Sequence, residues 1–395
     1  MNTIYDISIW LYVMAIRISA FFHPKAKLWI DGRKDIFKQL EKIQKNNNIV
    51  WFHCASLGEF EQGKPIIKSY KLKYPKHKIL VTFFSSSGFE IEKKSTLANW
   101  VFYLPADTKS NAKKFIRLVN PIKSFFIKYE FWFNYIYELK QKNIPIYSVS
   151  TIFRDKQRFF KYQWFAKQLK NINYFFVQDE ASKILLNSIG IYNITIIGDT
   201  RFDNVFEKAQ NPIEIKLIQL FSKRNKTIVF GSTWPQDEKI LIQYIKNHPE
   251  NNYIIAPHEL YNCKSLCKRT NGIAYSKVNK ENILTTNTVI IDNIGLLANI
   301  YQYGDLAYIG GGFKSGLHNI LEAVAFGLPV IFGPKYKNFN EATNLLKKKG
   351  AISISNYQEL ISAVNAFNTF DKSIAYNYIK ENLGGTKKIL SVIGQ

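Results

Sequence analysis

The sequence predicts an α/β protein of two Rossmann-like, doubly wound domains that face each other across an interdomain cleft. Short runs of β-branched and aromatic residues recur along the chain, and each is followed by a polar or amphipathic stretch. The runs are apolar almost without interruption, which is typical of parallel strands buried on both faces. The series breaks once, in a charged stretch near residues 203–226, and then resumes. A chain of 395 residues is long enough for two such domains.

Residues 31–205 carry the first series and are expected to form an N-terminal domain. The predicted strands are 49–56, 79–85, 101–105, 124–129, 144–150, 174–178 and 194–199. The intervening stretches, such as 60–74 and 111–119, are long enough for the helices that connect parallel strands. Ligands of such sheets bind beyond the carboxyl ends of the strands. We therefore expect the residues that carry the chemistry directly after each strand.

A hinge or linker is predicted at residues 206–226, and a second Rossmann-like domain at residues 227–395. The expected strands of this domain are 227–232, 253–257, 289–293, 306–311, 329–334 and 351–355.

Residues 1–30 are expected to form an N-terminal membrane-associating segment. Residues 7–22 are apolar apart from Arg17 and are followed by a basic run. A transmembrane helix needs about 20 apolar residues, so this stretch is marginal for a span. Its aromatic residues and the lysines that follow suit a helix that lies in the membrane interface. The alternative is a core helix of the first domain.

The net charge of +24 indicates an anionic partner, because 54 Lys and Arg stand against 30 Asp and Glu. Nucleic acid, anionic lipid headgroups and phosphorylated substrates all satisfy this condition, and so does a merely solvated lysine-rich surface. Three cysteines cannot build a disulfide framework, which fits a reducing compartment. Cys263 and Cys267 lack the further ligands of a structural zinc site.

The clearest candidate for a nucleotide site is the glycine-rich segment 310–322, GGGFKSGLHNILE. A strand is expected to end here and a helix to start near His318. Gly311 and Gly312 would let backbone N–H groups approach a phosphate, which the helix N-terminus also favours. Asn319 and Glu322 would share one helical face, and Glu322 could accept hydrogen bonds from ribose hydroxyls. The alternative is a plain strand-to-helix turn.

Three further segments follow strands of the second domain. Ser232 and Thr233 can cap the next helix and offer hydroxyls to a phosphate, or serve as caps alone. His258 follows Pro257 at the end of a strand and could contact a nucleotide. Residues 292–296, which include Gly295, end another strand.

Acid–base candidates lie in the first domain. Glu59 follows the first strand, where a carboxylate can act as general base, and the helix dipole is expected to lower its pKa and keep it ionised. The alternative is a first-turn Glu that only complements the dipole. Glu130 follows the fourth strand, and Arg201 lies at the mouth of the hinge, where a cation could stabilise a leaving phosphate. No Asp-x-Asp pair occurs, so the usual metal–diphosphate clamp is missing and a metal-independent enzyme without a cofactor is expected.

Taken together, these segments resemble the Kdo (3-deoxy-D-manno-octulosonic acid) transferases of lipopolysaccharide synthesis, which have the two-domain GT-B fold. The resemblance runs from about His53 to the segment after Pro334. Its most specific parts are HCASLGE (53–59), YLPADT (103–108), EFWFN (130–134), GDTRFD (198–203) and GGGFKSGLHNILEAVAFGLPVIFGP (310–334).

The resemblance implies a role for each matching residue. Glu59 matches the proton acceptor of the family, and Glu130 and Arg201 match two positions that stabilise the transition state. The positions that match CMP-binding segments are Pro257, His258, Ile294, Gly295, Leu296, Asn319, Ile320, Leu321 and Glu322. Ser232, Thr233, Gly311, Gly312 and His318 join them because they follow strands.

The implied reaction is an inverting transfer of Kdo. Glu59 would remove a proton from a glucosamine hydroxyl of a lipid A precursor (lipid IVA), and that hydroxyl would attack the anomeric carbon of CMP-Kdo. The N-terminal domain would bind the acceptor and the C-terminal domain the nucleotide sugar. The implied location is the cytoplasmic face of the bacterial inner membrane, with an anionic membrane surface and no nucleic acid as partner. The alternatives are another GT-B enzyme, such as a UDP-sugar epimerase or a different nucleotide-sugar transferase, and a non-enzymatic basic protein that binds nucleic acid.

Overall fold

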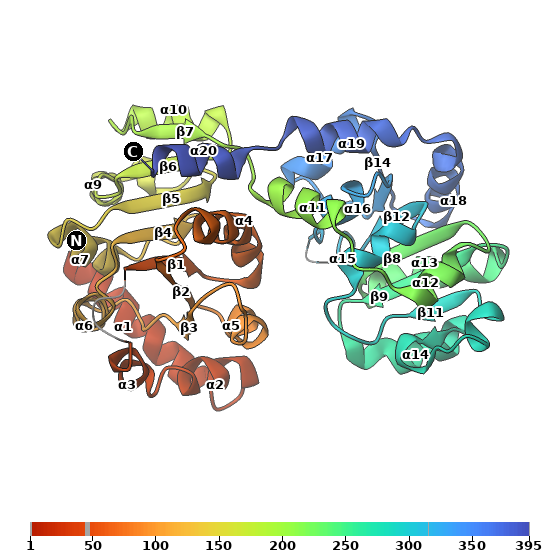
Figure 1. Cartoon of the computed structure of the whole chain (residues 1–395), viewed down its shortest axis with the longest axis horizontal. Coiled ribbons are helices and arrows are strands. Elements are labelled where there is room, and N and C mark those ends of the chain that lie inside the picture. Colours follow the sequence, from red (N-terminus) through yellow and green to blue (C-terminus); the bar gives the residue numbers. More distant parts are fainter. Residues whose placement is uncertain (1, 44–47, 315, 395) are drawn as a thin grey trace. The chain divides into compact units, whose positions relative to one another are not determined.

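The computed structural model describes residues 2–43, 48–314 and 316–394. Residues 1, 44–47, 315 and 395 belong to the predicted segments 1–30, 31–205 and 227–395 and lie outside the described residues. The chain divides into two compact units, Met1–Asn204 with Leu383–Gln395, and Val205–Asn382. Within the described residues each unit holds one parallel sheet with helices on both faces, which confirms the predicted fold class (Figure 1).

The first sheet confirms the strands predicted for its part of the chain. Its described strands are β1 (Ile49–Cys54), β2 (Lys78–Phe83), β3 (Trp100–Tyr103), β4 (Lys123–Ile127), β5 (Ile146–Thr151), β6 (Tyr174–Val177) and β7 (Ile194–Ile196). Their spatial order is β3-β2-β1-β4-β5-β6-β7. Every residue of β1 is buried, because helices cover both faces.

The helices of the first unit pack on its two faces. They are α1 (Asn2–Ser19), α2 (Pro24–Asp31), α3 (Ile36–Glu41), α4 (Leu57–Lys73), α5 (Ser86–Glu92), α6 (Lys109–Val119), α7 (Phe133–Gln141), α8 (Arg158–Lys161), α9 (Gln163–Leu169), α10 (Glu180–Ser188) and α20 (Gly385–Val392). Residues of α3, α6, α7, α9 and α10 join one hydrophobic core with Trp51. Residues of α4 and α20 join the core on the other face with Phe52.

The second sheet repeats this plan. Its described strands are β8 (Thr227–Thr233), β9 (Asn252–Pro257), β10 (Ile273–Ala274), β11 (Thr288–Ile290), β12 (Leu306–Ile309), β13 (Val330–Phe332) and β14 (Ala351–Ser353), in the order β10-β11-β9-β8-β12-β13-β14. The sequence missed β10, which has two residues and therefore no hydrophobic period to detect. The helices are α12 (Lys216–Ser222), α13 (Pro235–Asn247), α14 (Cys263–Thr270), α15 (Leu297–Ile300), α16 (Leu321–Val324), α17 (Asn340–Lys347), α18 (Tyr357–Ala366) and α19 (Lys372–Glu381).

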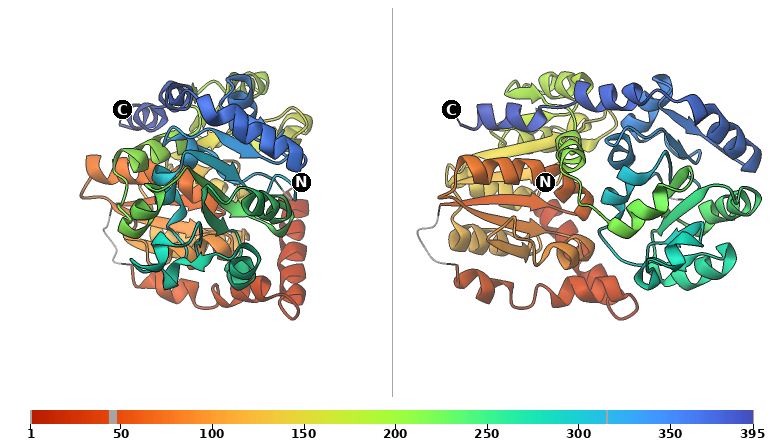
Figure 2. Two further views of the ribbon diagram at one scale, coloured as in Figure 1. Left: turned by 90° about the vertical axis from the view of Figure 1, so that its right-hand side faces the viewer. Right: turned by 45° about the vertical axis from the view of Figure 1, so that its right-hand side comes forward.

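Two parts of the predicted domain division, the C-terminal end and the hinge, differ from the structure. Leu383–Gln395 belongs to the first unit rather than to the second, because α20 packs on α4 and Lys73 Nζ donates to the carbonyl of Leu390 at 3.0 Å (Figure 2). The predicted hinge contains α12 and the end of α11 (Arg201–Gln210), so it is largely helical.

The N-terminal segment is two helices rather than one. Within the described residues no helix is both long and apolar enough to cross a membrane. One side of α1 attaches to the segment between β3 and α6: the Tyr5 hydroxyl donates to Asp107 Oδ2 at 2.5 Å, and Asp6 pairs with Lys109 at 2.8 Å. Large apolar side chains stay exposed on α1 and the turn after it, among them Ile4, Ile7, Trp10, Leu11, Ile18, Phe21 and Phe22.

Candidate active site

The candidate residues lie where the strand order of each sheet reverses. In the first sheet β1 and β4 are neighbours, and the helices that follow them, α4 and α7, cover opposite faces. Such a reversal opens a crevice at the carboxyl ends of the strands. Glu59 follows β1 and Glu130 follows β4. In the second sheet the reversal falls between β8 and β12, which end at Thr233 and before Gly310.

Glu59 lies in the first turn of α4 and is 7% exposed. Its Oε2 accepts a hydrogen bond from the backbone N–H of Ala55 at 2.5 Å, while the Ser56 side chain caps the helix by accepting from the N–H of Glu59 at 3.4 Å. Burial raises the pKa of Glu59 to about 7, against the opposing effect of the Ala55 N–H and the charge of Lys128. The expectation of a lowered pKa was wrong, because desolvation outweighs the helix dipole.

Glu130 is half-buried and shares the electrostatic environment of Glu59. Burial, and after it the charge of Glu59, raises the pKa of Glu130 to about 8, against the opposing charge of Lys128. Two carboxylates therefore face one cation at the carboxyl edge of β1 and β4. The two carboxyls of such a pair lose their protons in two separate steps, because the charge of one opposes ionisation of the other.

Lys128 is held at this edge by a strained backbone. It follows β4 with φ of +61°, in the left-handed region, which costs a non-glycine residue roughly 1–2 kcal/mol. Its N–H donates to the carbonyl of Val149 at 2.7 Å, and its own carbonyl accepts from the Thr151 hydroxyl at 2.9 Å. These bonds to β5 fix the backbone from which the lysine side chain extends.

Arg201 is held at the same edge of the sheet by an ion pair with Asp199. Its Nη2 and Nε lie 2.7 and 2.8 Å from Asp199 Oδ2. Asp199 also accepts from Gln62 Nε2 at 3.2 Å, and Gln62 lies one turn after Glu59 on α4. Burial raises the pKa of Asp199, but the charge and hydrogen bonds of Arg201 outweigh burial, so the pKa is lowered. The structure thus brings Glu59, Glu130 and Arg201 to one end of one sheet.

Several other residues of the motifs have structural roles. His53 is fully buried, and its Nε2 accepts from Trp132 Nε1 at 3.0 Å. Because an indole can only donate, the ring proton lies on Nδ1, which donates to Thr82 Oγ1 at 2.9 Å. Burial lowers the pKa of His53 to about 3, so the ring is neutral. Asp107 accepts from the N–H groups of Asn134 and Tyr135 at 3.2 and 3.1 Å and so caps α7.

The glycine-rich turn of the second unit is packed tightly against its own backbone. A Cβ on Gly312 would lie 2.6 Å from the nitrogen of Gly333. Gly311 has φ of +93°, and its N–H donates to Asp237 Oδ2 at 3.0 Å. Tyr308 donates to the other oxygen of Asp237 at 2.7 Å. The glycines are therefore needed for packing, and the Gly311 N–H is already bonded within the protein.

Three rings gather beside this turn. Trp234 stacks on His258 with ring centroids 4.4 Å apart, and His258 stacks on His318 at 4.5 Å. Trp234 Nε1 donates to His318 Nε2 at 2.9 Å, and the Lys314 ammonium lies 3.8 Å from the centre of the Trp234 ring. Burial and the neighbouring His258 lower the pKa of His318 to about 4, so this ring is neutral. The three rings thus form a stacked cluster, with a cation over the Trp234 ring.

Some local predictions for the second unit were wrong. The helix after the glycine-rich turn begins at Leu321, not near His318, so Asn319 and Glu322 do not share a helical face. Asn319 instead accepts from the N–H of Leu321 at 3.2 Å. Neither Ser232 nor Thr233 caps a helix: Trp234 occupies the N-cap of α13, and Asp237 accepts its N–H at 2.9 Å. The reason is a bulge at Ser232, φ +53°, which extends β8 by one residue.

The remaining nucleotide candidates differ in what they can offer a ligand. The side chains of Thr233, Pro257, Ile320 and Leu321 are buried, so any contact must come from their backbone. Ile294 and Gly295 lie exposed in the loop after β11, next to half-buried Leu296. Glu322 is half-buried at the start of α16.

Sequence reasoning missed Lys128, Trp234 and Lys314. Lys128 carried one weak signal, a charge placed at the end of an otherwise apolar strand. The role of Trp234 depends on two histidines far away in the sequence, which no local pattern reveals. Across residues 2–43, 48–314 and 316–394, no group of three or more His, Cys, Asp or Glu side chains could hold a metal ion.

Comparison with known proteins gives consistent matches for the sequence. Residues 32–204 match the family model described as 3-deoxy-D-manno-octulosonic-acid transferase (kdotransferase). The chain is 30% identical over 389 residues to the 3-deoxy-D-manno-octulosonic acid transferase of Rickettsia conorii, covering 92% of this chain and 82% of that protein. The transferase of the same description from Aquifex aeolicus is 26% identical over 342 residues, with 85% and 90% covered.

Comparison with solved structures shows the fold. A putative UDP-N-acetylglucosamine 2-epimerase from Listeria monocytogenes superposes with a TM-score of 0.59 at 11% identity, covering 88% of this chain and 96% of that one. MurG of Acinetobacter baumannii gives a TM-score of 0.52 at 9% identity, with 88% and 99% covered. The two parallel α/β units are thus of the GT-B type.

Proposed function

Because the chain belongs to the 3-deoxy-D-manno-octulosonic acid (Kdo) transferase family, we propose that it transfers Kdo from CMP-Kdo to a lipid A precursor, lipid IVA, with inversion at the anomeric carbon. Glycosyl transfer by this family needs a group that deprotonates the acceptor hydroxyl and groups that receive the leaving phosphate. The observation that carries the proposal is Glu59, a buried carboxylate with a pKa near neutrality at a topological switch point.

Glu59 acts as the general base in this proposal. The hydroxyl of a glucosamine unit forms the new C–O bond to the anomeric carbon as its proton passes to Glu59, and the bond from that carbon to the CMP phosphate breaks. Burial and the charge of Glu59 raise the pKa of Glu130, so Glu130 can hold a proton and donate a hydrogen bond next to an ionised Glu59.

The positive charge around the two carboxylates supports the handling of the leaving group. Lys128 and the Arg201–Asp199 pair lie at the same edge of the sheet, where positive groups stabilise negative charge that develops on a phosphate. We propose that the second unit holds CMP on the stacked rings of Trp234, His258 and His318, with Lys314 available to an anionic group. The backbone around Gly312 and residues 294–296 and 319–322 completes this site.

The exposed apolar residues of α1 support attachment to a membrane surface. Ile7, Leu11 and Ile18 lie on the solvent side of α1, and Arg17 and the nearby lysines add positive charge. A helix of this kind lies in the interface of an anionic bilayer, where a lipid acceptor is found. We propose the cytoplasmic face of the bacterial inner membrane as the place of action.

The test is an assay of the purified full chain with CMP-Kdo and lipid IVA, read as product mass. We expect a mass increase of one or more Kdo units, and a higher melting temperature with CMP but not with UDP. A melting shift with UDP and conversion of UDP-N-acetylglucosamine, without Kdo transfer, would instead identify an epimerase on the same fold.

A further inference from the structure

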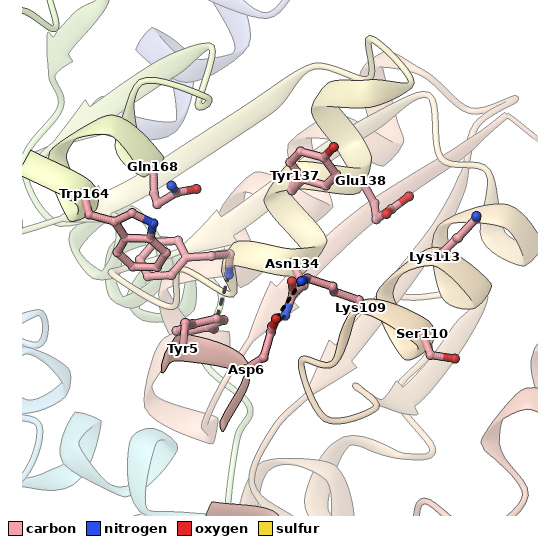
Figure 3. A pocket seen from close by; sticks show the side chains of 11 residues that line it. Tyr5, Asp6, Lys109, Ser110, Lys113, Asn134, Tyr137, Glu138, Trp164 and Gln168 are labelled. Carbon is pink, nitrogen blue, oxygen red and sulfur yellow. Dashed lines mark hydrogen bonds and ion pairs between the residues drawn. The ribbon is translucent and has the colours of Figure 1, made fainter. Parts of the chain in front are cut away.

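A pocket of about 500 Å³ opens in the first unit and has no part in the proposed mechanism. Its walls come from the start of α1 and from α6, α7 and α9, so it lies within one unit (Figure 3). The volume falls in the usual range of small-molecule sites.

The pocket begins close to the catalytic edge. Phe133 on its wall lies three residues after Glu130, which limits their Cα separation to about 11 Å. Lys109 and Ser110, also on its wall, follow β3 at the same end of the sheet. The N-terminal ends of α6 and α7, which supply part of its wall, thus lie at the same edge of the sheet as Glu130.

Hydrogen bonds between distant parts of the chain fix the walls in advance. The Tyr5 hydroxyl accepts from the N–H of Phe133 at 3.4 Å while it donates to Asp107. Asn134 Nδ2 donates to Asp6 Oδ1 at 3.2 Å and to the carbonyl of Asp107 at 2.7 Å. Burial raises the pKa of Tyr5 far above its usual range, so its hydroxyl keeps the proton. A preformed site binds without the cost of ordering its walls.

Aromatic rings and polar groups alternate around the pocket. Figure 3 shows Trp164 and Gln168 at one end, Lys113 and Ser110 at the other, and Tyr137 from α7 between them. Trp164 is braced by Phe133, with ring centroids 5.2 Å apart at 85°. Tyr137 is 52% exposed, so its ring remains accessible.

The charges of the lining residues cancel. Asp6 is paired with Lys109 at 2.8 Å, and the two other charged residues on the wall, Lys113 and Glu138, have opposite signs. The pocket therefore has no excess of positive charge with which to select a bare phosphate. Glu138 accepts hydrogen bonds, Lys113 donates them, and the Ser110 hydroxyl does both, as the hydroxyls of a sugar require.

We propose that this pocket binds a saccharide ring, stacked by its C–H face on Tyr137 and hydrogen-bonded through its hydroxyls to Glu138 and Ser110. The identity of the ring rests on the proposed function: it is the glucosamine unit of the acceptor that does not carry the attacking hydroxyl. The pocket thus sets which hydroxyl of the disaccharide reaches Glu59.

The experiment titrates the full chain with a methyl glycoside of the β-1,6-linked glucosamine disaccharide, without phosphate or acyl chains, and follows binding by saturation-transfer NMR. Tyr137→Ala and Glu138→Gln are the pocket variants. Tyr192→Ala, at an aromatic residue that is 75% exposed and outside the pocket, is the matched control. Melting temperatures verify that all variants fold.

We expect saturable binding to the wild-type chain, weakened about 2- to 10-fold by Tyr137→Ala and unchanged by Tyr192→Ala. In the transfer assay Tyr137→Ala should raise KM for lipid IVA by a similar factor with kcat within twofold. Absence of disaccharide binding, equal binding by the pocket variants, or saturable binding of inorganic phosphate alone would overturn the proposal. Disaccharide binding without any Kdo transfer would leave the saccharide pocket standing and defeat the proposed function.

Discussion

Replacing Glu59 by Gln should stabilise the protein at alkaline pH while it removes activity. The folded protein raises the pKa of this carboxyl from 4.5 to about 7, so the folded state resists its ionisation. The unfolded chain releases the proton at the lower pKa, and each unit of difference is worth 1.36 kcal/mol, following the linkage relation. Below about pH 4.5 the carboxyl is protonated in both states and does not change the free energy of unfolding. As the pH rises from there to about 7, the carboxyl lowers the free energy of unfolding by a growing amount.

The expected magnitude follows from this window. At pH 8 the penalty reaches about 3 kcal/mol, and at pH 5 it is below about 1 kcal/mol. Gln cannot ionise, and its side-chain oxygen can still accept from the N–H of Ala55, so the capping bond is preserved. Glu59→Gln should therefore be more stable than wild type by about 3 kcal/mol at pH 8, and by little at pH 5.

Activity should change in the opposite direction. Loss of a general base typically lowers the rate about 10²- to 10⁴-fold. The assays are urea unfolding at pH 5 and pH 8 and initial rates of Kdo transfer. Glu180→Gln is the matched control, because Glu180 also lies in the first turn of a helix that follows a strand, but its side chain is 62% exposed. We expect this control to change stability by at most about 1 kcal/mol and to leave the rate unchanged.

Two results would contradict this role of Glu59. If Glu59→Gln kept a rate near that of wild type, Glu59 would not be the base. If Glu59→Gln destabilised the protein equally at both pH values, the Glu59 side chain would only stabilise the start of α4. That is the alternative given above for a Glu in the first turn of a helix.

The remaining predictions concern the same edge and the glycine-rich turn. The ratio kcat/KM should fall as the pH drops through about 7, because Glu59 must be ionised to act. A plot of kcat/KM against pH would show this fall as its acidic limb. Lys128→Met should move that limb to higher pH, since the lysine charge lowers the pKa of both Glu59 and Glu130. Gly312→Ala should cost about 1–3 kcal/mol in thermal unfolding, because the added Cβ meets the backbone of Gly333 at 2.6 Å.

Each of the two substitutions, Lys128→Met and Gly312→Ala, has a control on the same chain. Lys140→Met removes an exposed lysine of α7 and should leave the pH profile in place. Gly58→Ala adds a Cβ where only the Ser56 hydroxyl lies within 4 Å, so it should not destabilise. An unshifted pH limb in Lys128→Met would contradict the electrostatic role of that lysine. A Gly312→Ala protein as stable as wild type would mean that the two turns can move apart at no cost.

Backbone strain marks both switch points. Lys128 and Ser150 in the first sheet, and Ser232 in the second, are non-glycine residues in left-handed backbone at the carboxyl ends of strands. Ser150 and Ser232 sit at irregularities in strand register, after Val149 and Gly231. Such bulges re-aim the residues that follow a strand, and they concentrate next to functional sites.

Local patterns were enough to predict the sheets. A parallel strand covered on both faces must be apolar at successive positions, so each buried strand is visible in the sequence without reference to its partners. That is why the run 49–56 predicted β1 and the run 227–232 predicted β8. The same logic placed Glu59 and Glu130 directly after strands, because the carboxyl ends of parallel strands share one edge.

What the sequence left open depended on packing between distant segments. It placed α20 in the wrong unit, since an amphipathic helix does not show which apolar surface it will cover. It assigned Glu59 a lowered pKa, because the dipole of α4 is a local feature whereas desolvation depends on all that surrounds the carboxylate.

The pattern of residues along the chain was enough to predict the two parallel sheets, the edge at which ligands bind, and the two carboxylates that follow strands there. Folding was needed to bring Lys128 and the Arg201–Asp199 pair to the edge that holds these carboxylates, and to bring Tyr5 and Trp164 together in the wall of a pocket. A hydrophobic period is a property of a few neighbouring residues, so it can be recognised in the sequence alone. Desolvation, ion pairing and cavity shape instead arise from residues that meet only when the chain has folded.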